Sequence, residues 1–148
     1  MCWKHDYLEL KNLEKGGRRL EDLELLGLLR TFFREEVAPR LETARTTLGR
    51  AGYQARVRST APWETWGADD AVLLEVREDR RPLHSPVLWF RVMPRVERGA
   101  GRADIGVLYS QPFGGEREGA VSLGLTAGDQ LQAQLDHFLV HDELKGHA

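Results

Sequence analysis

His137 and His141 stand four residues apart within a stretch of helical periodicity, so both side chains fall on one face of the expected helix. Two imidazoles in this arrangement can bind zinc when a third ligand arrives from elsewhere. The motif is incomplete, however, because no glutamate directly follows His137, as metalloprotease chemistry requires. The pair also shares its stripe with the polar residues Gln130 and Gln134. We therefore interpret it as a solvated helix face and predict neither a metal nor a cofactor.

Nucleophilic and phosphate-binding motifs give no stronger indication of catalysis. No serine has the Gly-x-Ser-x-Gly surroundings of a nucleophile elbow. Cys2 is the one cysteine, and its place near the N-terminus is more typical of an incidental thiol than of a catalytic one. The glycine-rich segments 98–106 and 112–119 lack the strand–loop–helix context and the lysine of a P-loop, and they are typical of hairpin turns. We predict no catalytic residue and favour a non-enzymatic protein.

Arginine and tryptophan give the more useful signal. Seventeen of the 21 basic residues are arginine, which forms durable contacts with carboxylates and phosphates and stacks on indole rings. Several of these arginines alternate with apolar residues in strand-like segments, beside Trp89. Such a surface suits a protein partner, a homodimer or unpaired nucleic acid, whereas the simplest alternative is a solvated sheet face with Arg–Glu pairs. The predicted binding residues are Arg56, Arg58, Arg77, Trp89, Arg91 and, at the rim, Trp66.

Trp63 and Trp66 lie in a segment that is otherwise rich in turn formers. Continuing the alternation of the preceding strand from Val57 places Trp63 on the buried face, as the last core residue of that strand. Trp66 falls out of this register, after a turn. We therefore expect Trp63 to pack in the core, and Trp66 to form a lid or a contact at the end of the sheet.

Helical periodicity occurs near both ends of the chain. Apolar residues recur at helical spacing through residues 18–37 and 39–52, and Pro39 predicts a kink or a restart between these segments. A gap beneath that kink is the place where a ligand pocket would form. A short helix is expected in residues 5–17, and a last helix in residues 126–144.

The middle of the chain changes to alternating periodicity, which is typical of strands with one buried face. The connecting segments are too short for helical crossovers, so successive strands should pair antiparallel, as a meander. We predict a single α+β domain over residues 1–148, with two layers. In it, a meander of four to five strands packs on an N-terminal kinked helix and a C-terminal helix. The expected strands are 53–61, 71–79, 85–95, 103–111 and 120–125.

Composition disfavours a polyanion-binding protein, a secreted protein and a membrane protein. A formal net charge of −2 disfavours a general polyanion binder, and the N-terminal segment does not resemble a secretory signal. A single cysteine is typical of a reducing compartment, so we expect a cytoplasmic protein with no membrane span. The helix–meander–helix order is similar to small bacterial effector-chaperone and immunity-type folds.

The favoured function is accordingly a bacterial protein-binding module of the adaptor, chaperone or immunity-like kind, with a homodimer as one form. Two alternatives stay open at this point. One is a single-stranded nucleic-acid binder that uses the open sheet face. The other is a small enzyme or ligand carrier with its pocket between helix and sheet.

Overall fold

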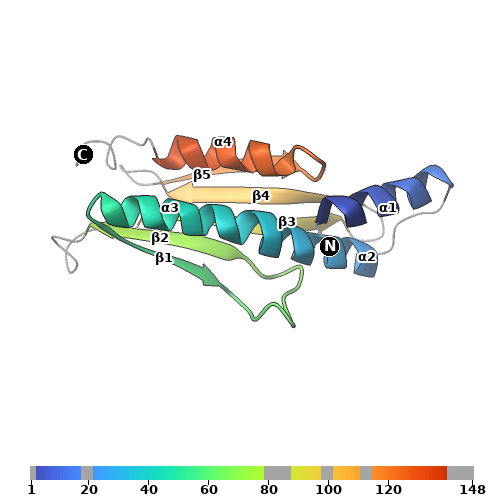
Figure 1. The fold of residues 1–148 in the computed structure, drawn as a ribbon, viewed down its shortest axis with the longest axis horizontal. Helices are drawn as coiled ribbons and strands as arrows, with labels where there is room; N and C mark the ends of the chain where they lie inside the picture. Colours follow the sequence, from blue (N-terminus) through green and yellow to red (C-terminus); the bar gives the residue numbers. More distant parts are fainter. Residues whose placement is uncertain (1–2, 18–21, 79–87, 98–101, 111–114, 140–148) are drawn as a thin grey trace.

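The protein is an α+β domain of two layers, as the sequence predicts (Figure 1). The structure, a computed structural model, describes residues 3–17, 22–78, 88–97, 102–110 and 115–139. The helical elements are α1 (Trp3–Lys15), α2 (Asp22–Phe32), the π-helix η1 (Phe33–Val37), α3 (Ala38–Arg50) and α4 (Ala127–Leu139). The strands are β1 (Tyr53–Ser59), β2 (Val72–Glu78), β3 (Leu88–Glu97), β4 (Arg102–Ser110) and β5 (Glu116–Ser122). They form one antiparallel sheet in sequence order, which confirms the predicted meander.

The helices lie on one side of this sheet, with α3 packed on β1 and β2 and α4 packed on β5 (Figure 1). The core between the layers is built from alternate strand residues and from the apolar stripes of the helices, as the two periodicities predict. Its strand residues include Leu74, Val76, Phe90, Val92, Ile105 and Val107, all with at most 1% of their surface exposed. The opposite side of the sheet is not covered by any described helix. We call this side the open face.

The long N-terminal helix stays helical past Pro39, but it widens immediately before this residue. Proline cannot donate an N–H to the preceding turn, and its ring crowds the carbonyl of Glu35 four residues earlier. The π-helical turn η1 lies at this position and relieves the crowding, and α3 then begins at Ala38. Pro39 itself is exposed, whereas Val37 and Leu41 on either side are fully buried. The predicted restart therefore occurs, but core side chains occupy the place beneath it where a pocket was expected.

The last strand begins earlier than its apolar residues suggest. We expected residues 120–125, but β5 is Glu116–Ser122, and Leu125 beyond it is exposed. Gly115, with a φ of 86°, turns the chain into the strand. Pairing with β4 from Ser110↔Glu116 to Asp104↔Ser122 then supplies backbone hydrogen bonds to a segment of poor strand propensity. This shift adds two glutamates to the open face.

Candidate functional site

Two parallel rows of side chains cross the centre of the open face, and the strand register defines them. The first row runs from β1 to β5 through Arg56, Glu75, Trp89, Ser110 and Glu116. The second row runs in the same direction through Arg58, Leu73, Arg91, Leu108 and Glu118. Both rows have arginine at the β1 edge and glutamate at the β5 edge. The structure therefore brings four of the six predicted binding residues into two neighbouring rows, and Arg77 lies beside them on β2.

Trp89 and Arg91 occupy the middle strand of these rows, and both are partly exposed. Arg91 lies between Leu73 and Leu108 across the sheet. Its Nε is buried and has no hydrogen-bond partner among the described residues. A buried donor that lacks an acceptor costs free energy, on the order of 1–3 kcal/mol. The middle of the open face thus holds a guanidinium in apolar surroundings, next to an indole, with its Nε shielded from solvent.

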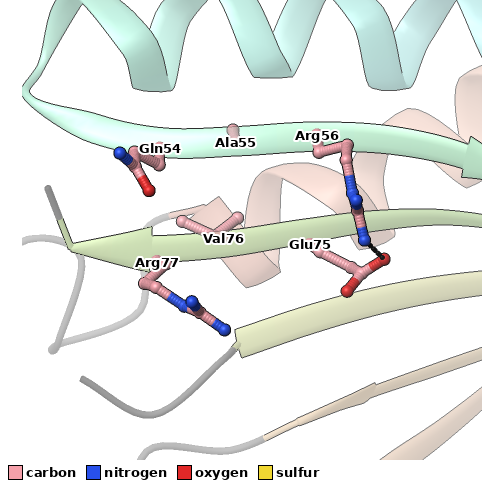
Figure 2. A pocket seen from close by; sticks show the side chains of 6 residues that line it. All are labelled: Gln54, Ala55, Arg56, Glu75, Val76 and Arg77. Atoms are coloured by element: carbon pink, nitrogen blue, oxygen red, sulfur yellow. Dashed lines mark hydrogen bonds and ion pairs between the residues drawn. The ribbon is translucent and has the colours of Figure 1, made fainter. Parts of the chain in front are cut away.

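Ion pairs hold the basic edge of the face. Arg56 and Arg58 both contact the Glu75 carboxylate, at 3.3 Å and 3.1 Å. Figure 2 shows the pair that Arg56 forms with Glu75. The two arginine side chains are 70% and 53% exposed, so each pair contributes at most about 1 kcal/mol to stability. Solvated arginines sharing one carboxylate can exchange it for another at little cost.

A hollow of about 260 Å³ opens beside these pairs, at the end of β1 and β2. Figure 2 shows the side chains that line it, from Gln54, Ala55, Arg56, Glu75, Val76 and Arg77. Arg77 is exposed there, without a hydrogen bond or ion pair to another described residue. The hollow is shallow and strongly polar, so it suits a side chain of a docking partner better than an enclosed small molecule.

The acidic edge of the face is arranged differently. Arg95 extends across Gly106 and contacts the carboxylate of Glu118 on the far strand. A Cβ at Gly106 would lie 2.5 Å from the Arg95 Nε, so only glycine leaves this path open. Glu116 is exposed and makes no hydrogen bond or ion pair with any described residue. The glutamate at the end of the first row is thus available to a partner.

Of the two tryptophans in the β1–β2 connection, Trp63 packs on the core as expected, whereas Trp66 does not follow the sequence expectation. Trp66 is fully buried, its ring 4.6 Å from that of Phe33, so its predicted role as an exposed contact is wrong. Trp63 does pack against the core, but only partly buried, at the rim. β1 ends at Ser59, but the alternation of burial continues through Ala61 to Trp63, and the turn follows at residues 62–65, where the Thr65 N–H donates to the Pro62 carbonyl and the chain then brings Trp66 into the core.

His137 is exposed on α4 and lies 2.6 Å from a guanidinium nitrogen of Arg117 through its Nε2. Because arginine only donates, this contact makes Nε2 the acceptor and places the ring proton on Nδ1. His141 lies outside the described residues. A second group of potential ligands, His5, Asp6 and Glu9, lies together on the surface of α1. Exposed acidic groups of this kind are common without a metal, so neither group defines a metal centre.

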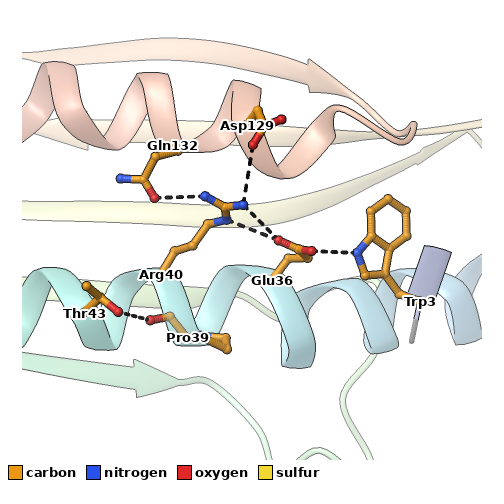
Figure 3. Close-up of polar contacts among 7 residues, drawn as sticks. All are labelled: Trp3, Glu36, Pro39, Arg40, Thr43, Asp129 and Gln132. Atoms are coloured by element: carbon orange, nitrogen blue, oxygen red, sulfur yellow. Dashed lines mark hydrogen bonds and ion pairs between the residues drawn. The ribbon is translucent and has the colours of Figure 1, made fainter. Parts of the chain in front are cut away.

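A polar cluster joins residues of α1, η1, α3 and α4 on the helical side of the molecule, and no pattern in the sequence indicates it. Glu36, on η1, accepts a hydrogen bond from the Trp3 indole at 3.0 Å and pairs with Arg40 at 3.1 Å (Figure 3). Arg40 in turn donates to Gln132 on α4. A Cβ at Gly128 would lie 2.6 Å from the Glu36 carboxylate, so α4 approaches this cluster closely. Every member is partnered, which identifies the cluster as a structural clamp between α1, η1 and α4.

Tyr109 is the remaining buried polar side chain of interest. It is 1% exposed, and its hydroxyl has no hydrogen-bond partner among the described residues. Burial raises the pKa of this hydroxyl above its usual value, although the positive charge of Arg117 opposes the effect. Its ring packs between Phe90 and Phe138 in the core. These ring contacts give Tyr109 a packing role in the core.

Comparisons with known proteins add no relative: no family model, no curated protein and no solved structure matches this chain. Within the described part of the chain, no helix combines the length and the apolar character that a membrane crossing requires. The site therefore has to be interpreted from its own chemistry.

Proposed function

We propose that this chain is a non-enzymatic protein-binding module that docks its partner through the open face. The contact residues are Arg56, Arg58, Arg77, Trp89 and Arg91. The observation that carries the proposal is that Trp89 and Arg91, both partly exposed, lie two residues apart in the middle of a sheet face that no described helix covers. Arginine and tryptophan at the centre of a surface, with charges around them, are the residues that most often dominate protein interfaces.

The charge of the open face supports a protein partner over a nucleic acid. The two central rows contain three arginines and three glutamates, so they present no net positive field. Nucleic-acid surfaces need an excess of basic residues along the backbone path, and sheet-based ones add several stacking aromatics. Trp89 is the one aromatic residue in these rows. A face with balanced, separated charges matches a protein surface with the opposite arrangement.

Within this class, an adaptor, chaperone or immunity-like role in a bacterial cytoplasm is the setting we propose. The single cysteine is typical of chains that work in a reducing compartment, and the adaptor role requires binding alone. Neither the exposed group of His5, Asp6 and Glu9 nor the open hollow beside β1 and β2 gives a specific indication of a catalytic role.

Photo-crosslinking in the native host tests this proposal. A photoreactive phenylalanine derivative replaces Leu108, which is partly exposed in the second row, and a control variant carries it at Thr46, which is exposed on α3 in the opposite layer. We expect a discrete protein adduct from position 108 and none from position 46. Equal labelling from both positions, or an adduct with nucleic acid alone from position 108, would contradict the proposal.

A further inference from the structure

The charges of the open face are complementary to the same face of another copy. Arg56 and Arg58 lie on β1, while Glu116 and Glu118 lie on β5, the opposite edge strand. The intervening strands β2 and β4 contribute Leu73 and Leu108 in matching positions of the second row. We infer that the partner is a second copy of this chain, docked face to face about a two-fold axis. This inference rests on the proposed function, because it names the occupant of the same face.

One orientation of the two-fold axis places the β1 arginines on the β5 glutamates and Leu73 on Leu108. The axis runs along β3, in the plane between the two sheets. Rotation about it places β1 of one copy on β5 of the other and β2 on β4, and β3 faces its own counterpart. An axis across the strands would instead place β1 on β1 of the second copy, so that arginines would face arginines at that edge. Nearly aligned strands are also the usual arrangement of two sheets that pack face to face, at an angle of about 30°.

The rotation brings specific groups together. Arg56 faces Glu116 of the second copy, and Arg58 faces its Glu118, each contact occurring twice by symmetry. Leu73 faces Leu108 in the same way. The axis also places Trp89 opposite Trp89 and Arg91 opposite Arg91 of the second copy, so the two guanidinium groups avoid each other by turning toward the indoles, two residues or about 6.6 Å along the strand. Glu116, which has no partner among the described residues of its own copy, thereby gains one, whereas Arg56 and Arg58 exchange or share Glu75 and Glu118 is shared with Arg95.

The availability of the edge charges supports this pairing. Glu116 has no partner among the described residues, and the Arg56 side chain is 70% exposed. Within one copy, four strand spacings of about 4.8 Å separate β1 from β5, or roughly 19 Å, so Arg56 and Glu116 of the same copy cannot meet. Any energetic coupling between these two residues must therefore act between molecules.

The size of the face predicts a modest affinity. Five strands spaced about 4.8 Å apart, with seven residues of about 3.3 Å each, give a footprint of roughly 550 Å² per copy. The total of about 1,100 Å² is at the low end of specific protein interfaces. We therefore expect a reversible dimer with a dissociation constant in the micromolar range.

Charge reversal tests the inference directly. Sedimentation of the full chain over a range of micromolar concentrations gives the dissociation constant for the wild type, for Arg56→Glu and for Glu116→Arg. Each single variant should dissociate at least about tenfold more easily, because the reversed charge meets a like charge at two symmetric positions. An equimolar mixture of the two variants should form a 1:1 heterodimer of near wild-type affinity, since every edge pair is then complementary again. Arg50→Glu and Glu64→Arg, exposed outside the face, match the two changes in net charge and should leave dimerisation unaltered.

The outcomes separate this inference from the proposed function. A wild type that stays monomeric at all concentrations, or variants that do not associate when mixed, would overturn the second copy as partner. If position 108 then still crosslinks to a different protein in the host, the open face remains a docking surface and only the inferred partner is wrong. Association in the mixture would also show that the single variants are folded, because two misfolded variants would not regain affinity on mixing.

Discussion

Arg56 and Glu116 stand at the two ends of one five-residue row that crosses the open face of the sheet. The next row repeats the relationship with Arg58 and Glu118. Charges on a merely solvated sheet face are expected to form cross-strand pairs. Glu75 forms such pairs with Arg56 and Arg58, and Glu118 pairs with Arg95, whereas Glu116 has no partner among the described residues. Arginines at the β1 edge and glutamates at the β5 edge nevertheless give the two rows a direction, which is what a specific docking surface requires.

Adjacent residues of β3 should respond differently to truncation. Phe90→Ala removes a fully buried ring and should cost about 3–5 kcal/mol of unfolding free energy. Trp89→Ala should cost about 1–2 kcal/mol, because its ring is partly exposed and water can fill the vacated space. Urea unfolding of both variants compares these values. Equal losses would show that Trp89 is a core residue and not a contact residue.

Arg91→Met should separate stability from binding. The substitution keeps an unbranched side chain of similar length but removes the buried Nε that lacks an acceptor, so stability should stay level or increase by about 1 kcal/mol. Association through the open face should weaken, because the guanidinium is lost. Thermal unfolding and sedimentation measure the two effects. A clear loss of stability would assign Arg91 a structural role instead.

Tyr109→Phe should stabilise the protein and reduce its sensitivity to alkali. The hydroxyl is buried without a partner, so its removal should add about 1 kcal/mol at neutral pH. Because burial raises the pKa of Tyr109 in the folded state, the folded protein holds this proton more tightly than the unfolded chain does. The contribution of Tyr109 to the free energy of unfolding should therefore be constant below about pH 10 and decrease above it.

Urea unfolding of the wild type and of Tyr109→Phe at pH 8 and pH 10.5 isolates this contribution, since all other groups titrate in both proteins. The difference between the two proteins should widen at the higher pH. A difference that stays the same at both pH values would mean that the Tyr109 hydroxyl is not desolvated.

Glu36→Gln should loosen the N-terminal helix. The carboxylate accepts from the Trp3 indole and pairs with Arg40, and the neutral amide cannot replace the ion pair. We expect a loss of about 1–3 kcal/mol and a red shift of the Trp3 fluorescence as α1 detaches. Glu42→Gln, which alters only an exposed pair with Arg45, is the control and should change stability by less than about 0.5 kcal/mol. Matching losses in the two variants would argue against a clamp.

Local periodicity was sufficient to predict the sheet and its two faces. In the regular strands the alternation of Leu74 and Val76 with Leu73 and Glu75 assigned each residue to the correct side, because side chains of a strand alternate strictly. Short connections then fixed the strand order. The four central contact residues, Arg56, Arg58, Trp89 and Arg91, followed from this register alone.

Features that depend on tertiary contacts could not be predicted in the same way. Extension of the β1 alternation placed Trp63 correctly against the core, whereas the burial of Trp66 depends on the turn at residues 62–65 and on packing against Phe33. The charged start of β5 resembled a connection, since its strand conformation depends on pairing with β4. Glu116 and Glu118, and with them the acidic edge, were missed for this reason.

Oxidative footprinting of tryptophan tests the central claim, occupancy of the open face, most directly. The oxidation rate of Trp89 is measured by mass spectrometry in cells of the native host and in dilute purified protein, relative to Trp63, which is partly exposed at the rim of the core. We predict that Trp89 is oxidised several-fold more slowly in cells, because a partner covers it there. An unchanged ratio of Trp89 to Trp63 would show that the open face is left to solvent, and it would contradict this account.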